Sequence, residues 1–216
     1  MAHRVVQGLV GGCTLLLGVM VTGCAAPQYT YVANSGANTY FKVPHSWHQI
    51  GADALSAELK AVTGSSGGGW QVAYEAGGKP TAGDFLSFAT GQPFVFAEIG
   101  TLTQAGSQDL SYNVLRDIFL PVTSTTRQSE PPNYPLTGFK LIRDQNLTPG
   151  LGVHGVRETF DYTLNGATDT FDEIALTNAE QTVVYFLVLH CTETCYSSDQ
   201  TAINDVMSSF TIRSSP

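Results

Sequence analysis

The sequence is poor in basic residues. Ten Lys and Arg stand against 18 Asp and Glu, and the formal net charge is −8 at pH 7. Electrostatic repulsion makes such a chain a poor partner for nucleic acid and for anionic lipid headgroups. We therefore exclude nucleic acid as a partner, and any attachment to a membrane has to come from something other than a basic patch.

The sequence also lacks the signals expected of a cofactor-dependent or metal-dependent enzyme. Gly150-x-Gly152-x-x-Gly155 has the letters of a dinucleotide-binding fingerprint, but Pro149 precedes it and a strand pattern follows where a helix should begin. His45 and His48 lie around a turn in extended chain, which directs them to different sides. Serines and aspartates are abundant, but abundance does not assemble a catalytic triad. We predict no catalytic residue, no cofactor and no metal site.

Cysteine is scarce, with four in the chain, and the position of Cys24 is informative. Arg4 lies near the start, and a mostly apolar segment from Leu9 to Val21 leads into Val21-Thr22-Gly23-Cys24. The segment is too short to span the hydrocarbon of a bilayer and is typical of a secretory signal. The motif that ends it looks like a bacterial lipobox, in which the cysteine is acylated and becomes the first residue of the mature protein.

We therefore predict a lipoprotein signal peptide over residues 1–23 and acyl chains, palmitate among them, on Cys24. Two or more acyl chains hold a protein stably at a membrane, so the predicted location is the extracytoplasmic face of the cell membrane. The alternative is ordinary signal cleavage after Ala26, although Pro27 would then follow the cut and usually obstructs that peptidase.

Cys191 and Cys195 remain in the mature chain, where an exported protein meets an oxidising environment. We predict a disulfide between them. A redox-active pair usually has two intervening residues at a helix start, whereas three intervene here and follow a predicted strand. A metal site would need more ligands than the neighbouring His190.

Residues 25–38 are mostly small and polar, which is typical of a flexible linker. We predict a tether over residues 24–38 that carries the lipidated Cys24, followed by a single domain over residues 39–216. A chain of this length can bury a sizeable core and leaves little for a second domain.

Hydrophobic periodicity predicts the order of the secondary structure. Asn165-Gly166 is a strong hairpin signal, and the apolar run from Thr182 to Leu189 is typical of a central strand buried on both faces. A helix is expected over 108–119, capped by Ser107, with the apolar stripe Leu110, Val114, Leu115 and Ile118. Two further helices are expected over 53–62 and 199–209, and Ser197 or Ser198 is expected to cap the second. Further strands are expected over 70–75, 93–102, 139–143, 153–164 and 168–176. Strands in meander order with a few helices predict an α+β fold, a mostly antiparallel sheet sandwiched by helices.

Two short patterns resemble a known family. Phe41-Lys42-Val43-Pro44 with Trp47 near the start resembles the opening of the Mog1/PsbP-like fold. Cys191-x-x-x-Cys195, followed by a helix and Ser209-Phe210-Thr211-Ile212, resembles the end of many actinobacterial envelope lipoproteins. Many actinobacterial envelope lipoproteins are predicted to share that fold. The resemblance covers about residues 39–213 and implies an α/β/α sandwich and a protein-binding accessory role. It supplies no catalytic residues.

A pair of glutamates is the sharpest candidate site. If Asn165-Gly166 forms a two-residue turn, Glu158 faces Glu173, Phe160 faces Phe171, and Tyr162 lies on the same side of the hairpin. Opposed carboxylates among aromatic residues are unfavourable unless a cation, a basic ligand group or a shared proton compensates. We therefore predict a ligand or ion site at Glu158, Glu173 and Tyr162. The structural alternatives are a β-bulge that shifts the register, solvation at the rim of the sheet, or a salt bridge with Arg143 or Arg157.

These observations favour a membrane-anchored, non-catalytic binding or accessory factor of the cell envelope. Its partners would be the lipid bilayer, reached through the acyl chains, and an envelope protein. The alternative is a small-molecule carrier or sensor with a pocket on the sheet. A remote alternative is a hydrolase that uses the carboxylate pair. The aromatic residues that would line the pocket, and that more commonly form core, are Phe85, Phe88, Phe94, Phe96, Phe160 and Phe171.

Overall fold

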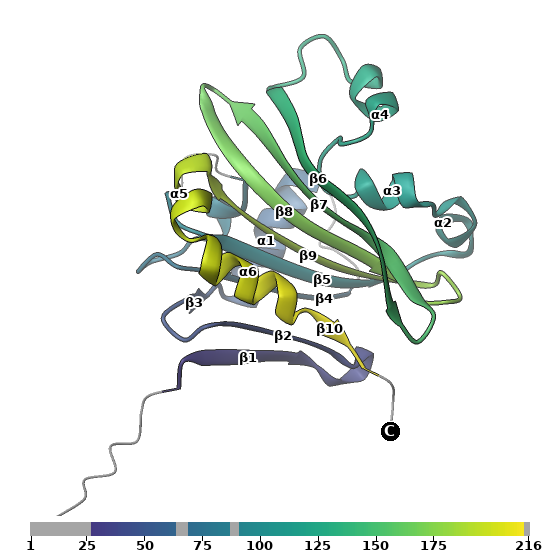
Figure 1. The fold of residues 1–216 in the computed structure, drawn as a ribbon, viewed down its shortest axis with the longest axis horizontal. Coiled ribbons are helices and arrows are strands. Elements are labelled where there is room, and N and C mark those ends of the chain that lie inside the picture. Colours follow the sequence, from purple (N-terminus) through teal and green to yellow (C-terminus); the bar gives the residue numbers. More distant parts are fainter. Residues whose placement is uncertain (1–26, 64–68, 87–90, 214–216) are drawn as a thin grey trace, which may run out of the picture.

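A large antiparallel sheet forms the centre of the protein (Figure 1). The computed structural model describes residues 27–63, 69–86 and 91–213. The strands of the sheet, β3 to β9, lie side by side in the order β3-β4-β5-β9-β8-β7-β6, and each neighbouring pair is antiparallel. In chain order they are β3 (His48–Gln49), β4 (Gly69–Glu75), β5 (Phe94–Thr101), β6 (Leu136–Gly150), β7 (Val153–Leu164), β8 (Ala167–Thr177) and β9 (Val183–Thr192).

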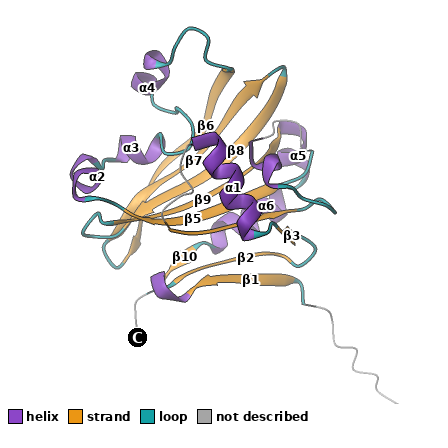
Figure 2. Ribbon diagram, turned by 180° about the vertical axis from the view of Figure 1, so that it is seen from behind, coloured by secondary structure: helices purple, strands orange, loops and turns teal. Residues whose placement is uncertain are grey.

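A second, smaller sheet and short helices cover the large sheet. The small sheet has the order β1 (Tyr29–Asn34), β2 (Thr39–Pro44) and β10 (Thr211–Ile212). Helix α6 packs against β2 and β9 on one face of the large sheet, and α1 crosses the opposite face (Figure 2). The helices are α1 (Ala52–Thr63), α2 (Gln104–Asp109), α3 (Tyr112–Arg116), α4 (Ser124–Ser129), α5 (Glu193–Ser198) and α6 (Gln200–Ser209), with 3-10 turns η1 (Ser35–Ala37) and η2 (Ala82–Leu86).

Side-chain alternation divides the hydrophobic core between the two faces of the sheet. In β9, Leu187 and Leu189 belong to the core under α6, whereas Phe186 and Val188 belong to the core under α1. All four side chains are buried, which confirms the predicted central strand. The predicted α+β fold with an antiparallel sheet between helices is therefore confirmed.

The turn between β7 and β8 confirms the predicted hairpin. Asn165 and Gly166 have φ values of 51° and 84°, so both lie in the left-handed region that a two-residue hairpin turn requires. The register then runs without a shift from Leu164 opposite Ala167 to His154 opposite Thr177. The turn thus fixes which side chains of β7 and β8 meet.

The predicted helix over 108–119 is wrong, because the chain forms two short helices there. The Ser111 side chain accepts a hydrogen bond from the amide of Val114 and starts α3, while Thr103, not Ser107, caps α2. This interruption changes the face that is buried. Leu115 is buried, but Val114 and Ile118 from the predicted stripe are 46% and 40% exposed.

Strand β6 is much longer than the predicted strand over 139–143. It is an edge strand whose side chains are largely exposed, and its pairing with β7 is interrupted by register shifts. Leu141 and Ile142 are 47% and 52% exposed. A polar, irregular edge strand lacks the alternation by which strands are found in a sequence.

The predicted tether over residues 24–38 also needs correction. Tyr29–Asn34 forms β1, which pairs with β2 along its whole length. Val32 is buried in the core, and the Tyr29 hydroxyl donates a hydrogen bond to Asp205 of α6 at 2.7 Å. The domain thus includes the residues from Tyr29 on, ahead of the predicted boundary at residue 39. Cys24 and the predicted signal peptide lie outside the described residues.

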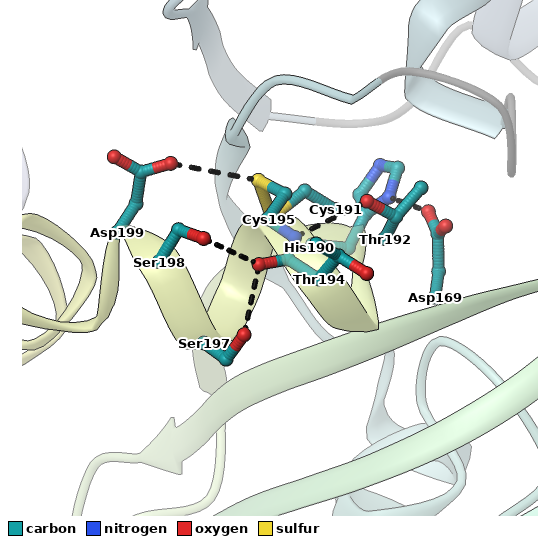
Figure 3. Close-up of a disulfide and its surroundings, with 9 residues drawn as sticks. All are labelled: Asp169, His190, Cys191, Thr192, Thr194, Cys195, Ser197, Ser198 and Asp199. Carbon is teal, nitrogen blue, oxygen red and sulfur yellow. Dashed lines mark hydrogen bonds and ion pairs between the residues drawn. A yellow bond between two sulfur atoms is a disulfide. The ribbon is translucent and has the colours of Figure 1, made fainter.

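A disulfide joins Cys191, in the last part of β9, to Cys195 in α5 (Figure 3). This is the predicted pairing. Helix α5 itself was not predicted, and it contains Ser197 and Ser198, whose hydroxyls donate to the carbonyl of Thr194. Neither serine caps α6, because Asp199 occupies the N-cap position and makes no side-chain capping bond. The disulfide therefore ties the central strand to the short helix that leads into α6.

Candidate functional site

Glu158 of β7 and Glu173 of β8 lie directly opposite each other, as the hairpin register predicts. Both side chains are 0% exposed. No register shift separates β7 from β8, so a β-bulge does not part the two carboxyls, and solvent at the rim does not reach them. Two of the three structural alternatives are thereby excluded.

The surroundings of the pair are apolar along the hairpin. Phe160 and Phe171, the next pair toward the turn, are stacked with ring centroids 5.4 Å apart. Val156 and Ala175, the next pair on the other side, are fully buried. Within the described part of the chain, none of the four carboxyl oxygens of Glu158 and Glu173 has a hydrogen-bond partner. Unpartnered buried carboxyls are costly and call for an explanation.

The third alternative, a salt bridge, is present in part, but with a different arginine. The Nε atom of Arg116, in α3, lies 3.6 Å from a carboxyl oxygen of Glu158. Arg116 makes closer contacts with Asp144, at 2.8 Å, and with Asn146, also at 2.8 Å. Arg157, which was expected to make this salt bridge, instead pairs with Asp172 at 2.7 Å. Asp172 is next to Glu173 in β8, so its side chain points to the opposite face of the sheet. Glu158 therefore shares its nearest cation with a better-placed carboxylate.

Burial controls the protonation of the pair. Loss of solvent raises the pKa of Glu158 to about 8, with Asp144 adding to the increase and Arg116 opposing it. Burial raises the pKa of Glu173 well above its ordinary value, and the neighbouring Glu158 raises it further. The pair consequently retains at least one proton at neutral pH.

Tyr162 does not join the carboxyl pair. Its hydroxyl donates a hydrogen bond to the carbonyl of Pro121, and Phe160 stands between Tyr162 and Glu158 along the same face of β7. Four residues of strand separate the α-carbons of Tyr162 and Glu158 by about 13 Å. The side chain instead holds the loop that follows α3, and burial raises the pKa of its hydroxyl.

A polar depression of about 380 Å³ lies above Glu158, which forms part of its lining. Its walls come from α3, the start of α4, the loop between them and β6. Apolar side chains, Phe139 and Leu141 among them, line part of the depression, and its polar lining includes Asn113, Arg116, Thr123, Arg127 and Asp144. The depression thus lies directly over one of the two buried carboxyls.

A second, apolar cavity of about 510 Å³ lies on the same face of the sheet. Phe85 and Phe96 from the predicted aromatic set line it, together with Leu59, Phe119 and Phe186, and Glu98 is the carboxylate in its wall. The other predicted aromatics belong elsewhere: Phe94, Phe160 and Phe171 are core residues, and Phe88 lies outside the described residues.

Sequence reasoning missed a buried His–Asp pair. The Nδ1 atom of His190 lies 3.0 Å from a carboxyl oxygen of Asp169, and both side chains are 0% exposed (Figure 3). The imidazole is stacked on Phe171 with centroids 5.1 Å apart. A dyad sealed in this way has no access for a substrate. Alternation along β8 and β9 would have placed both residues on one face, but nothing in the sequence indicates that they are buried there.

One serine motif was also overlooked. Gly64-Ser65-Ser66-Gly67-Gly68 has the letters of a hydrolase nucleophile elbow, which requires a strand before it and a helix after it. Here α1 precedes it and β4 follows it, so the context is reversed. The motif lies outside the described residues. Among those that are described, no group of three or more His, Cys, Asp or Glu side chains is arranged to hold a metal ion.

No protein-family model matches the chain, and no curated protein matches it. Solved structures of the expected Mog1/PsbP type are similar at low identity. Cyanobacterial PsbP from Synechocystis has a TM-score of 0.49 and 13% identity, over 88% of this chain and 96% of its own. LpqN of Mycobacterium tuberculosis, involved in cell envelope biogenesis, has a TM-score of 0.48 and 17% identity, over 87% and 91%. The Saccharomyces cerevisiae Ran-binding protein Mog1p has a TM-score of 0.45 and 10% identity, over 85% and 95%.

The raised pKa values predict an unusual dependence of stability on pH. Between about pH 5 and 8 the folded pair holds protons that the unfolded chain releases, so the free energy of unfolding should fall as pH rises. Glu173→Gln removes one of these two protons and should therefore reduce the slope of the free energy of unfolding against pH by about half. Urea denaturation at a series of pH values measures this. Glu180→Gln, at an exposed turn, is the matched control. Equal slopes for Glu173→Gln and the wild type would contradict the assignment.

Proposed function

We propose that this chain is a lipid-anchored protein of the bacterial envelope that acts by binding and not by catalysis. The motif Val21-Thr22-Gly23-Cys24 after an apolar leader supports acylation at Cys24. No helix among the described residues is long and apolar enough to cross a membrane. In this proposal the acyl chains provide the membrane affinity and the domain remains free to bind a partner.

The short link to the domain determines how it would sit. With β1 beginning at Tyr29, four residues separate Cys24 from the first strand. Even a fully extended link of this length spans only about 14 Å. The chain enters β1 at one end of the molecule, and α2 and α3 lie at the other (Figure 1). The depression above Glu158 and the apolar cavity, both bordered by α3 or the loop after it, would therefore face away from the bilayer.

Binding is favoured over catalysis because the side chains that could act as acids or bases in the His190–Asp169 pair and at Asp172 are buried, whereas the two cavities open at the surface. His190 and Asp169 form a dyad without solvent exposure. Asp172 is held by Arg157 and accepts a hydrogen bond from the Tyr196 hydroxyl at 2.9 Å. The apolar cavity and the polar depression, by contrast, open on the face that carries α1 and α3. This contrast is the observation that carries the proposal.

Cys24→Ser tests the anchor. The variant lacks the acylated thiol, and because each buried methylene contributes about 0.8 kcal/mol, we expect it to leave the membrane fraction almost completely. Detergent-phase partitioning and intact mass measure this. Cys13→Ser, within the leader, is the control and should behave as the wild type. Unchanged partitioning of Cys24→Ser, or a mature wild-type chain that begins at Pro27, contradicts lipid anchoring.

A second candidate function is the transport or sensing of a small apolar molecule, which the cavity of about 510 Å³ favours. Gly100 lies in its wall, and a Cβ atom added there meets no atom within 4 Å. A leucine at this position would place its side chain on the wall of the cavity, and its Cβ atom would meet no neighbour. Gly78, an exposed turn residue with equally open space, offers a matched control.

Native mass spectrometry of protein from its own cells tests the carrier function. A carrier should retain extra mass in the wild type and in Gly78→Leu, and lose about tenfold or more of it in Gly100→Leu, because a filled cavity excludes the ligand. Wild-type protein without bound mass, or equal occupancy in Gly100→Leu, argues against a carrier and leaves partner binding as the function.

A further inference from the structure

The carboxyl pair has too little positive charge beside it. Glu158 and Glu173 face each other, and the nearest cation, Arg116, lies 3.6 Å from Glu158. Arg116 makes a two-pronged contact with Asp144, at 2.8 Å and 3.2 Å, so its charge is largely matched by that carboxylate. The site therefore carries an excess of acceptors over donors.

The second arginine of the depression is also committed elsewhere. The Nε atom of Arg127 donates to the carbonyl of Val122 at 3.2 Å, and its guanidinium lies over the Phe139 ring, 4.0 Å from the centroid. Neither arginine of the lining donates a hydrogen bond to Glu158. An unpartnered carboxyl without solvent exposure thus lies at the base of an accessible depression.

The chemistry of the lining selects the group that would fill it. An anion is disfavoured, because Glu158, Asp144 and the neighbouring Asp117 are acidic. A metal ion would need more ligands than two carboxyls beside a guanidinium. A group with several N–H donors and a positive charge supplies what the carboxyls lack. The apolar side chains of Phe139 and Leu141 suit the alkyl stem that carries such a group.

We propose that the depression above Glu158 binds an ammonium or guanidinium group, with Glu158 as the direct acceptor and Glu173 as the buried carboxyl behind it. This deepens the proposed binding function and rests on it. The source that the surface favours is a basic side chain of a protein partner, because exposed apolar residues border the site as at a protein interface. These residues are Leu141, which lines the depression, and Val114 and Ile118, which line an adjoining depression that shares Asn113 and Thr123 with it.

Thermal unfolding of the full protein in detergent, at pH 7.5, tests the proposal with two probes. One is n-butylammonium chloride, compared with n-butanol and sodium chloride. The other is a blocked Ala-Lys-Ala tripeptide, compared with the same peptide carrying norleucine. A bound probe raises the unfolding midpoint in a saturable way. The wild type should respond to an amine probe and not to its neutral or inorganic counterpart.

Glu158→Gln should weaken the apparent affinity for the amine by about tenfold or more, because a hydrogen bond to a charged group is lost. Glu173→Gln serves as a second variant, and Glu180→Gln should respond as the wild type does. A response to the peptide alone identifies a protein side chain as the source, and a response to both probes identifies the amine itself.

No saturable response to either probe, or an unchanged response in Glu158→Gln, overturns the proposal. A proton shared by Glu158 and Glu173 would then be what makes the buried carboxyl pair tolerable. That result would leave lipid anchoring and partner binding untouched, since Cys24→Ser tests the anchor separately. Conversely, amine binding in a protein that is not acylated would contradict the anchor and support the site.

Discussion

Two buried carboxyls that face each other across a hairpin are the constraint on which the functional face of this protein depends. The left-handed conformations of Asn165 and Gly166 set the register of β7 and β8, and that register brings Glu158 opposite Glu173. The hairpin lies within the sheet, so neither carboxyl escapes to solvent. The cost of burying two opposed carboxyls can be lowered in three ways: by protonation, by the nearby guanidinium of Arg116, and by a bound cation.

The surrounding structure supports that pair from outside the sheet. Helix α3 brings Arg116 over the hairpin, and β6 supplies Asp144 and Asn146 to hold its guanidinium. The loop after α3 is fixed by Asp117, whose carboxylate accepts hydrogen bonds from the amides of Val122 and Thr123. Elements far apart in the chain therefore build one depression, and its base is the carboxyl that the hairpin register placed there.

Local patterns predicted the fold better than they predicted the site. The hairpin, the central strand β9 and the disulfide follow from turn chemistry, from a continuous apolar run and from cysteine usage, which act over a few residues. Arg116 was missed because its contact with Asp144 joins segments 28 residues apart and depends on an edge strand with an irregular register. The helix over 108–119 was wrong because Ser111 caps a new helix inside an otherwise helical pattern. Strand β1 was predicted to be part of a tether because it lies within the segment 25–38, which is mostly small and polar, although Val32 is buried in the core.

The protonation state of the pair can be measured directly by ¹³C NMR of the carboxyl carbons of Glu158 and Glu173 during a pH titration. The account predicts that Glu158 ionises near pH 8 and that Glu173 remains protonated at neutral pH. Ionisation of both carboxyls close to the ordinary glutamate value of 4.5 would contradict the account.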